Sequence, residues 1–257
     1  MSRQPRKISR TGFYHIYFRG INHCYLFEED EDFRRFLDIY VGVEEAFSLE
    51  LHAFCLMENH VHLLLKENEP GDIAAAMRRL LSPYASWFNK KYQRIGALIA
   101  DRFKSECVET DAYLLTLVRY IHRNPLEAGI VNRIGSYRWS SYNDYLKPGT
   151  GLVDAEFILG MFSADPAKAH KEFVDFHGGV DGECEDYSPS DSRRKSEQNV
   201  RLEIQSILEG LEPSAVGSLA KHERDALLKS LRESGFSIRQ IERATGISRG
   251  VIHKSTR

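Results

Sequence analysis

The feature that most constrains the fold is a pair of short apolar runs, residues 49–57 and 60–66, separated by Glu58-Asn59. Short apolar runs around a two-residue gap are typical of two strands joined as a hairpin. His60 and His62 begin the second run. Because residues two apart on a strand share a face, both imidazoles should point to the same side. Such a pair can begin a divalent-metal site, although a surface pair or a satisfied core pair is the commoner outcome.

The flanking sequence supplies the other elements of a mixed domain. Aromatic and β-branched residues predict a strand over 13–20, and residues 98–109 predict another. Helical spacing of apolar residues predicts helices over 29–47, 73–92 and 111–124, with a kink or restart at Pro83 and an end at Asn124-Pro125. This order favours an α+β fold, a four-stranded sheet with helices on one face in a split βαβ arrangement of the ferredoxin-like kind.

Length and composition exclude several classes of protein. The chain has 257 residues, 42% hydrophobic and 28% charged, which is typical of a globular protein with one large domain and an appendage. It has no apolar run long enough to cross a bilayer and no signal peptide, so we expect a cytoplasmic protein. The four cysteines form no Cys-x-x-Cys pair, which argues against a zinc ribbon or a disulfide framework.

The C-terminal part reads as a separate DNA-binding domain. A helix over 221–234, a short helix over 237–245, the turn Gly246-Ile247-Ser248 and a helix from Arg249 have the layout of a helix-turn-helix. Its small core is expected to contain Ile238, Ile241, Ala244, Ile247 and Val251. An arbitrary helical hairpin is the alternative, but the basic side chains favour DNA. These candidate DNA contacts are Arg239, Arg243, Arg249 and Lys254.

The helix predicted over 111–124 carries a second pair of polar residues. Tyr120 and Asn124 are four apart and therefore share one helical face. Without other evidence, Tyr120 would be interpreted as a half-buried aromatic residue and Asn124 as a helix terminator.

Taken together, the motifs resemble a known family. Met57–Leu65 contains the His-hydrophobic-His signature of the HUH nucleases. With Arg119–Pro125 and Trp139-Ser140-Ser141-Tyr142, it resembles the REP-associated tyrosine transposases, relatives of the single-tyrosine insertion-sequence transposases. The resemblance covers about residues 8–147. It implies an HUH transposase domain over 1–147, to which we add a helical extension over 148–180, a polar linker over 181–200 and the helix-turn-helix domain over 201–257.

The resemblance implies a transposase that cuts and joins single-stranded hairpin DNA in repeated extragenic palindromes. Tyr120 matches the nucleophile that forms a 5′-phosphotyrosine link. His60, His62 and Asn124 match the ligands of Mg²⁺ or Mn²⁺, a cation that would polarise the scissile phosphate. Insertion-sequence relatives are expected to use glutamine at the position of Asn124, and an apolar residue at the position of Arg123.

Further basic residues are candidates for phosphate contacts, each with a surface charge or an ion pair as the alternative. His15, His52 and His122 are not expected to be ligands, and His122 should face away from Tyr120. The candidates in the first domain are Arg19, Arg102, Lys104, Arg119 and Arg123.

Two other functions fit part of the pattern. A DNA-binding transcriptional regulator with a vestigial nuclease core would keep the C-terminal domain, but it has no reason to retain all of His60, His62, Tyr120 and Asn124. A replication initiator or relaxase would usually need a longer chain. The sequence leaves open whether the protein is a homodimer in which Tyr120 serves its own histidines or those of a partner.

Overall fold

The structure is a computed structural model, and it describes residues 6–147, 149, 151–179, 203–208, 210–236 and 238–256. The chain divides into two compact units, Met1–Tyr187 and Ser188–Arg257. The linker predicted over 181–200 lies outside the described residues. Among the described helices, none is long and apolar enough to cross a membrane.

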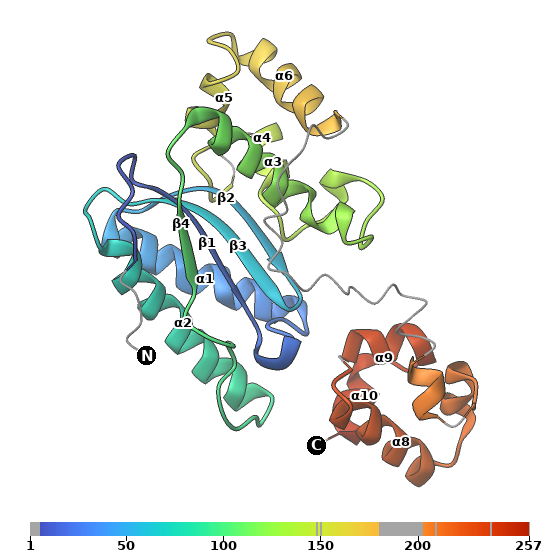
Figure 1. Cartoon of the computed structure of the whole chain (residues 1–257). Helices are drawn as coiled ribbons and strands as arrows, with labels where there is room; N and C mark the ends of the chain where they lie inside the picture. The colour runs from blue at the N-terminus through green and yellow to red at the C-terminus, as the bar shows by residue number, and fades with distance from the viewer. Residues whose placement is uncertain are drawn as a thin grey trace. The chain divides into compact units, whose positions relative to one another are not determined.

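The N-terminal unit is built on a four-stranded antiparallel sheet in the order β2-β3-β1-β4 (Figure 1). Its strands are β1 (Phe13–Arg19), β2 (Glu50–Met57), β3 (His60–Lys66) and β4 (Lys104–Cys107). The predicted hairpin is present, with β2 and β3 on either side of Glu58-Asn59. In the register, Tyr17 of β1 lies opposite both His62 of β3 and Lys104 of β4.

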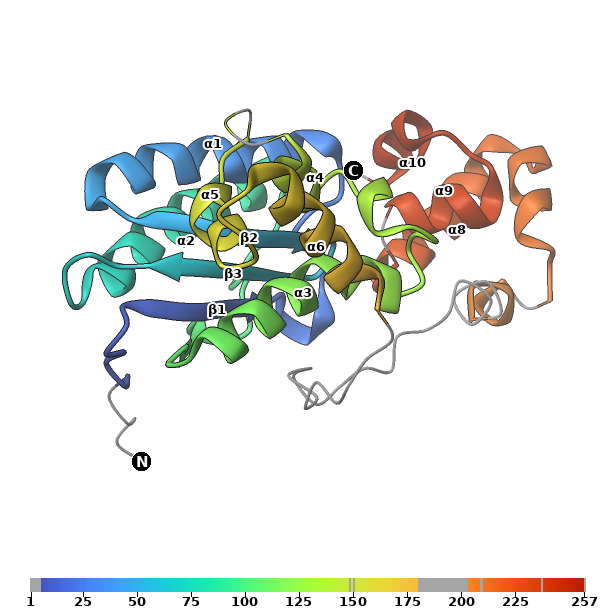
Figure 2. The same ribbon diagram turned by 90° about the horizontal axis from the view of Figure 1, so that it is seen from above.

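Helices cover both faces of this sheet, so the expectation of one covered face is wrong. Phe18 of β1 contacts Phe36 of α1 (Asp30–Phe47), with ring centroids 6.2 Å apart, and α1 packs beside α2 (Asp72–Lys91). Tyr120 of α3 (Asp111–Glu127) packs against His62 on the opposite face. Figure 2 shows α3 in front of the sheet and α2 behind it. The reason is that α3 follows the last strand, so no crossover ties it to the face of α1 and α2.

Three predicted boundaries differ from the structure. β4 is limited to four residues, whereas the sequence predicts a strand over 98–109. α2 is one helix that contains Pro83, and α3 continues through Pro125 to Glu127. A proline inside a helix removes one backbone hydrogen bond, and packing against the sheet can offset that loss. Both prolines lie in helices that are buried along one face.

A buried carboxylate fixes the start of α1. Asp32 is fully buried and accepts hydrogen bonds from the backbone N–H of Glu28 (2.7 Å) and of Glu29 (2.8 Å). Lys91 and the hydroxyl of Tyr92, at the end of α2, donate to the same carboxylate at 2.7 and 2.8 Å. This network joins the beginning of α1 to the end of α2.

The segment after α3 packs along β2. The backbone N–H of Leu56 donates to the carbonyl of Trp139 (2.9 Å), and that of Ser141 donates to the carbonyl of Phe54 (3.0 Å). The Trp139 ring stacks on Phe33 of α1 with centroids 4.5 Å apart. The remaining elements of this unit are η1 (Ile21–His23), η2 (Ile134–Ser136), α4 (Tyr142–Leu146), α5 (Ala155–Gly160) and α6 (Pro166–Gly178).

The C-terminal unit has its own small apolar core. The described elements include η3 (Pro213–Ser218), α8 (Lys221–Glu233), α9 (Ile238–Thr245) and α10 (Arg249–Ser255). Gly246, with φ +72°, provides the left-handed turn between α9 and α10. Ile238, Ile241 and Ile247 are buried as predicted, but Val251 is 36% exposed. The helical phase of α10 instead buries Ile252.

Candidate metal and nucleophile site

The sheet and α3 bring together the two pairs of polar residues that the sequence singled out. His60 of β3 places Nε2 3.3 Å from Oδ1 of Asn124 on α3. The other ring nitrogen, Nδ1, lies 2.7 Å from Oδ1 of Asn59, which can only accept. Nδ1 therefore carries the hydrogen in a neutral imidazole. The lone pair on Nε2 then faces the amide oxygen of Asn124, an arrangement that suits a shared cation.

The second histidine lies beside the tyrosine. The rings of His60 and His62 have centroids 5.2 Å apart, and the edge-to-face contact between His62 and Tyr120 has a centroid distance of 5.4 Å. His62 is buried and Tyr120 is half-buried. Two imidazole rings and an amide oxygen thus lie next to a phenol from the same chain, and such a donor set can hold a divalent cation with positions left for substrate oxygens.

Sequence analysis missed the residues behind His62. His15, which is not expected to be a metal ligand, is fully buried, and its Nε2 lies 2.9 Å from Nδ1 of His62. Glu106 of β4 places Oε2 3.9 Å from Nδ1 of His15, and Tyr17 donates to Oε1 at 2.7 Å. The sequence did contain a signal for these residues. His15 and Tyr17 are two apart on a predicted strand and therefore share one face, which in the structure is the face of His62.

The other side of α3 is joined to α6 by a buried hydrogen-bond chain. His177 places Nδ1 2.8 Å from the carbonyl of Phe173, so its Nε2 accepts from Nδ1 of His122 at 3.0 Å. Nε2 of His122 lies 2.9 Å from Oγ of Ser141. Burial lowers the pKa of His177 to about 4 and that of His122 well below its ordinary value. Both rings are therefore neutral near pH 7, and His122 faces away from Tyr120 as predicted.

Two of the candidate phosphate contacts have partners at the C-terminal end of α6. Arg123 donates to the carbonyl of His177 (2.9 Å), and Arg119 donates to the carbonyl of Gly179 (2.5 Å). These contacts satisfy carbonyl groups at the C-terminal end of a helix, where cations are favoured.

The other candidates are at the surface. Arg19 lies opposite His60 on β1, and Lys104 places Nζ 5.4 Å from the ring centroid of Tyr17, so both are on the side of the histidine pair. Arg102 is exposed. In the C-terminal unit, Arg243, Arg249 and Lys254 are exposed, and Arg249 pairs with Glu242 at 3.1 Å. The side chain of Arg239 lies outside the described residues.

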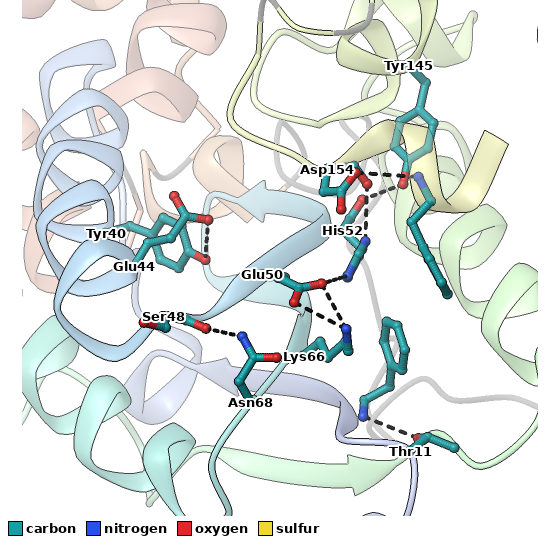
Figure 3. Close-up of polar contacts among 12 residues, drawn as sticks. Thr11, Tyr40, Glu44, Ser48, Glu50, His52, Lys66, Asn68, Tyr145 and Asp154 are labelled. Carbon is teal, nitrogen blue, oxygen red and sulfur yellow. Dashed lines mark hydrogen bonds and ion pairs between the residues drawn. The ribbon is translucent and has the colours of Figure 1, made fainter. Parts of the chain in front are cut away.

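A different group of possible metal ligands lies at the far end of the sheet. Glu50, His52 and Asp154 offer ligand atoms within 4.8 Å of one another (Figure 3). Six residues along β3 separate His60 from Lys66, the neighbour of Glu50, which is a distance of about 20 Å. Lys66 Nζ contacts both oxygens of Glu50, at 3.0 and 3.2 Å, and Asp154 caps α5. Because these carboxylates already have partners, we assign no ion to this group.

The N-terminal unit is similar in sequence to known transposases. Residues 10–124 match the model of the IS200-like transposases. This match lies within the N-terminal unit and spans less than half of the chain. The chain is 26% identical over 159 residues to a REP-associated tyrosine transposase of Haemophilus influenzae, a match that covers 57% of this chain and 89% of that protein. The chain is therefore an enzyme of the tyrosine transposase class.

A solved structure supports the fold. The chain is similar to a REP-associated tyrosine transposase that was solved bound to a REP hairpin, with a TM-score of 0.50 and 17% identity. The similarity covers 59% of this chain and 88% of the solved one. At this identity the similarity concerns the mixed fold, a four-stranded antiparallel sheet with helices.

Proposed function

We propose that this IS200-like transposase cleaves and rejoins single-stranded hairpin DNA through a covalent bond to Tyr120. The observation that carries the proposal is the convergence of Tyr120, His62, His60 and Asn124 across β3 and α3. The relative that was solved with a REP hairpin supports hairpin DNA as the substrate class.

The chemistry assigned to Tyr120 is a transesterification. Its hydroxyl oxygen bonds to the scissile phosphorus as the bond from phosphorus to the 3′-oxygen breaks. The phenol gives up its proton and the leaving oxygen gains one, so the products are a 5′-phosphotyrosine and a free 3′-hydroxyl. Attack by a 3′-hydroxyl on the phosphotyrosine reverses the exchange and joins strands without ATP.

His60, His62 and Asn124 would hold Mg²⁺ or Mn²⁺ in this proposal. The bound cation would supply charge stabilisation at the phosphate oxygens, which matters because a phenol with a pKa of about 10 is a weak nucleophile at neutral pH. Strand β3 fixes both imidazoles, and α3 fixes the amide and the phenol. Each of the four groups assigned to the reaction is therefore held by a strand or a helix.

Two more detailed proposals concern the core fold of the first unit and the function of the second unit. The strand order β2-β3-β1-β4 with α1 and α2 as connections supports a ferredoxin-like split βαβ core. The turn at Gly246 between α9 and α10, with exposed Arg249 and Lys254, supports a helix-turn-helix domain over 201–257 that binds duplex DNA. The transposase domain would occupy residues 1–147, and the helical extension that follows it would hold α3 in place through His177.

A denaturing gel with labelled single-stranded hairpin DNA tests the function. We expect a label on the protein band that requires Mn²⁺ or Mg²⁺ and is absent in Tyr120→Phe. Tyr113→Phe, on the same helix two turns earlier, is the matched control and should retain the adduct. Tight DNA binding without any adduct in the wild-type protein would instead support a regulator with a vestigial core.

Mixing variants tests which chain supplies the tyrosine. Tyr120 contacts His62 of its own chain, which supports a site completed within one chain. Tyr120→Phe mixed with His60→Ala should therefore remain inactive. Recovery of the adduct in the mixture would show a homodimer that exchanges its tyrosines.

A further inference from the structure

A row of side chains, from the partly exposed Glu106 to the fully buried His15, connects the sheet edge to Nδ1 of His62. Nε2 of His15 lies 2.9 Å from Nδ1 of His62, and the two rings stack with centroids 5.2 Å apart at 19°. His15 and His62 are 0% and 1% exposed, so water does not mediate between them. Glu106 lies opposite His15 in the register of β1 and β4, with Oε2 3.9 Å from Nδ1 of His15.

We propose that Glu106 and His15 act as a relay of positioning residues that holds His62 in the Nδ1–H tautomer. In this relay the N–H at Nδ1 of His15 points to the carboxylate, and Nε2 of His15 accepts from Nδ1–H of His62. Nε2 of His62 is then left with its lone pair, which a metal ligand requires. The use of that lone pair for a cation rests on the proposed function, whereas the tautomer of His62 does not.

The charge of Glu106 selects this tautomer over the alternative. If Nε2 of His15 carried the hydrogen, its Nδ1 lone pair would face a carboxylate at 3.9 Å. The distance is too long for a direct hydrogen bond, but His15 is fully buried, and the nearby negative charge still favours an N–H over a lone pair at Nδ1. The hydrogen bond that Tyr17 donates to Glu106 favours the charged carboxylate, because hydrogen bonds to the ionised form stabilise it.

Tyr17 and β4 hold the carboxylate in this orientation. The hydroxyl of Tyr17 donates to Oε1 of Glu106 at 2.7 Å, which leaves Oε2 for His15. Tyr17 also packs against His62, with centroids 6.0 Å apart. The relay thus uses two strands, β1 and β4, that contain none of the residues assigned to the metal.

Nitrogen NMR of histidine measures the tautomer directly, in the absence of metal and DNA. Long-range ¹H–¹⁵N spectra of full-length protein with ¹⁵N-labelled histidine distinguish Nδ1–H from Nε2–H, and a His62→Gln spectrum identifies the signals of His62. We expect Nδ1–H for His62 in the wild-type protein. Glu106→Gln offers an amide N–H to His15, so a substantial share of His62 should change to Nε2–H. Glu109→Gln, in the same segment but paired with Arg10, should leave the spectrum of His62 unchanged.

Metal affinity provides the second measurement. Titration of free Mn²⁺ by electron paramagnetic resonance should show binding about 10- to 100-fold weaker in His15→Phe, which keeps the ring volume but removes the acceptor. His15→Gln keeps an acceptor oxygen and should recover part of this loss. Equal affinity in His15→Phe and in the wild-type protein would overturn the relay.

The outcomes separate the two proposals. An Nε2–H tautomer for His62 in the wild-type protein refutes the relay, whatever the enzyme does with DNA. An Nδ1–H tautomer that responds to Glu106→Gln supports the relay even if no phosphotyrosine adduct forms, in which case only the proposed function fails.

Discussion

Acidification should weaken the N-terminal unit through the buried His177. Burial lowers the pKa of this ring from 6.5 to about 4. The unfolded chain therefore binds a proton more readily than the native protein, and the stability present above pH 6.5 is lost progressively as the pH falls towards 4. Between pH 7 and pH 5 this linkage amounts to about 2 kcal/mol for one histidine. His122 has a lowered pKa as well and acts in the same direction.

Urea unfolding followed by tryptophan fluorescence measures this effect, because both tryptophans, Trp87 and Trp139, lie in the N-terminal unit. His177→Gln keeps an amide oxygen that can accept from His122 but removes the titrating group. Its free energy of unfolding should fall by about 2 kcal/mol less than that of the wild-type protein between pH 7 and pH 5. His170→Gln, on the same helix but outside the buried chain, should follow the wild type. Identical pH profiles for His177→Gln and the wild type would refute the reasoning.

Three further changes test other parts of the structure. Asp32→Ala should cost about 3 kcal/mol in urea unfolding, because it leaves the Tyr92 hydroxyl and two backbone N–H groups without their shared acceptor. Asn124→Asp should tighten Mn²⁺ binding in a calorimetric titration, since a carboxylate replaces an amide oxygen near His60; weaker binding would argue against Asn124 as a ligand. Ile241→Ala should destabilise the C-terminal unit by about 2–5 kcal/mol while the tryptophan transition of the N-terminal unit stays in place, as circular dichroism and fluorescence together would show.

The sequence predicted the elements around the site well because their signals are local. The hairpin of β2 and β3 follows from two apolar runs and a two-residue gap, and α1 follows from its acidic start and apolar spacing. Tyr120 and Asn124 were correctly placed on one face of a helix. That this face meets His60 and His62 depended on the resemblance, because no spacing within either segment specifies which face of the sheet α3 covers.

Predictions that depended on tertiary packing were less successful. Pro125 reads as a helix end, but α3 is held beyond it by its contacts with the sheet. Arg119 and Arg123 stay predicted phosphate contacts, but the sequence did not reveal that their donors reach carbonyl groups at the C-terminal end of α6, more than 40 residues away in the chain. His15 and Glu106 come from strands that pair only in the folded protein. No local pattern reveals such partners.

The geometry of α3 links the candidate chemistry to the stability of the helical extension. One face of the helix presents Tyr120 and Asn124 to β3, while His122 and Arg123 attach its other side to α6. Because a helix moves as a rigid element, loss of the attachment should displace the phenol and the amide oxygen together. A displacement of about 1 Å at reacting atoms is enough to lower a rate by about 100-fold. The helical extension is therefore expected to be part of the catalytic unit, so the smallest active fragment should extend through α6 to residue 179, whereas a fragment that ends at residue 147 should lose adduct formation.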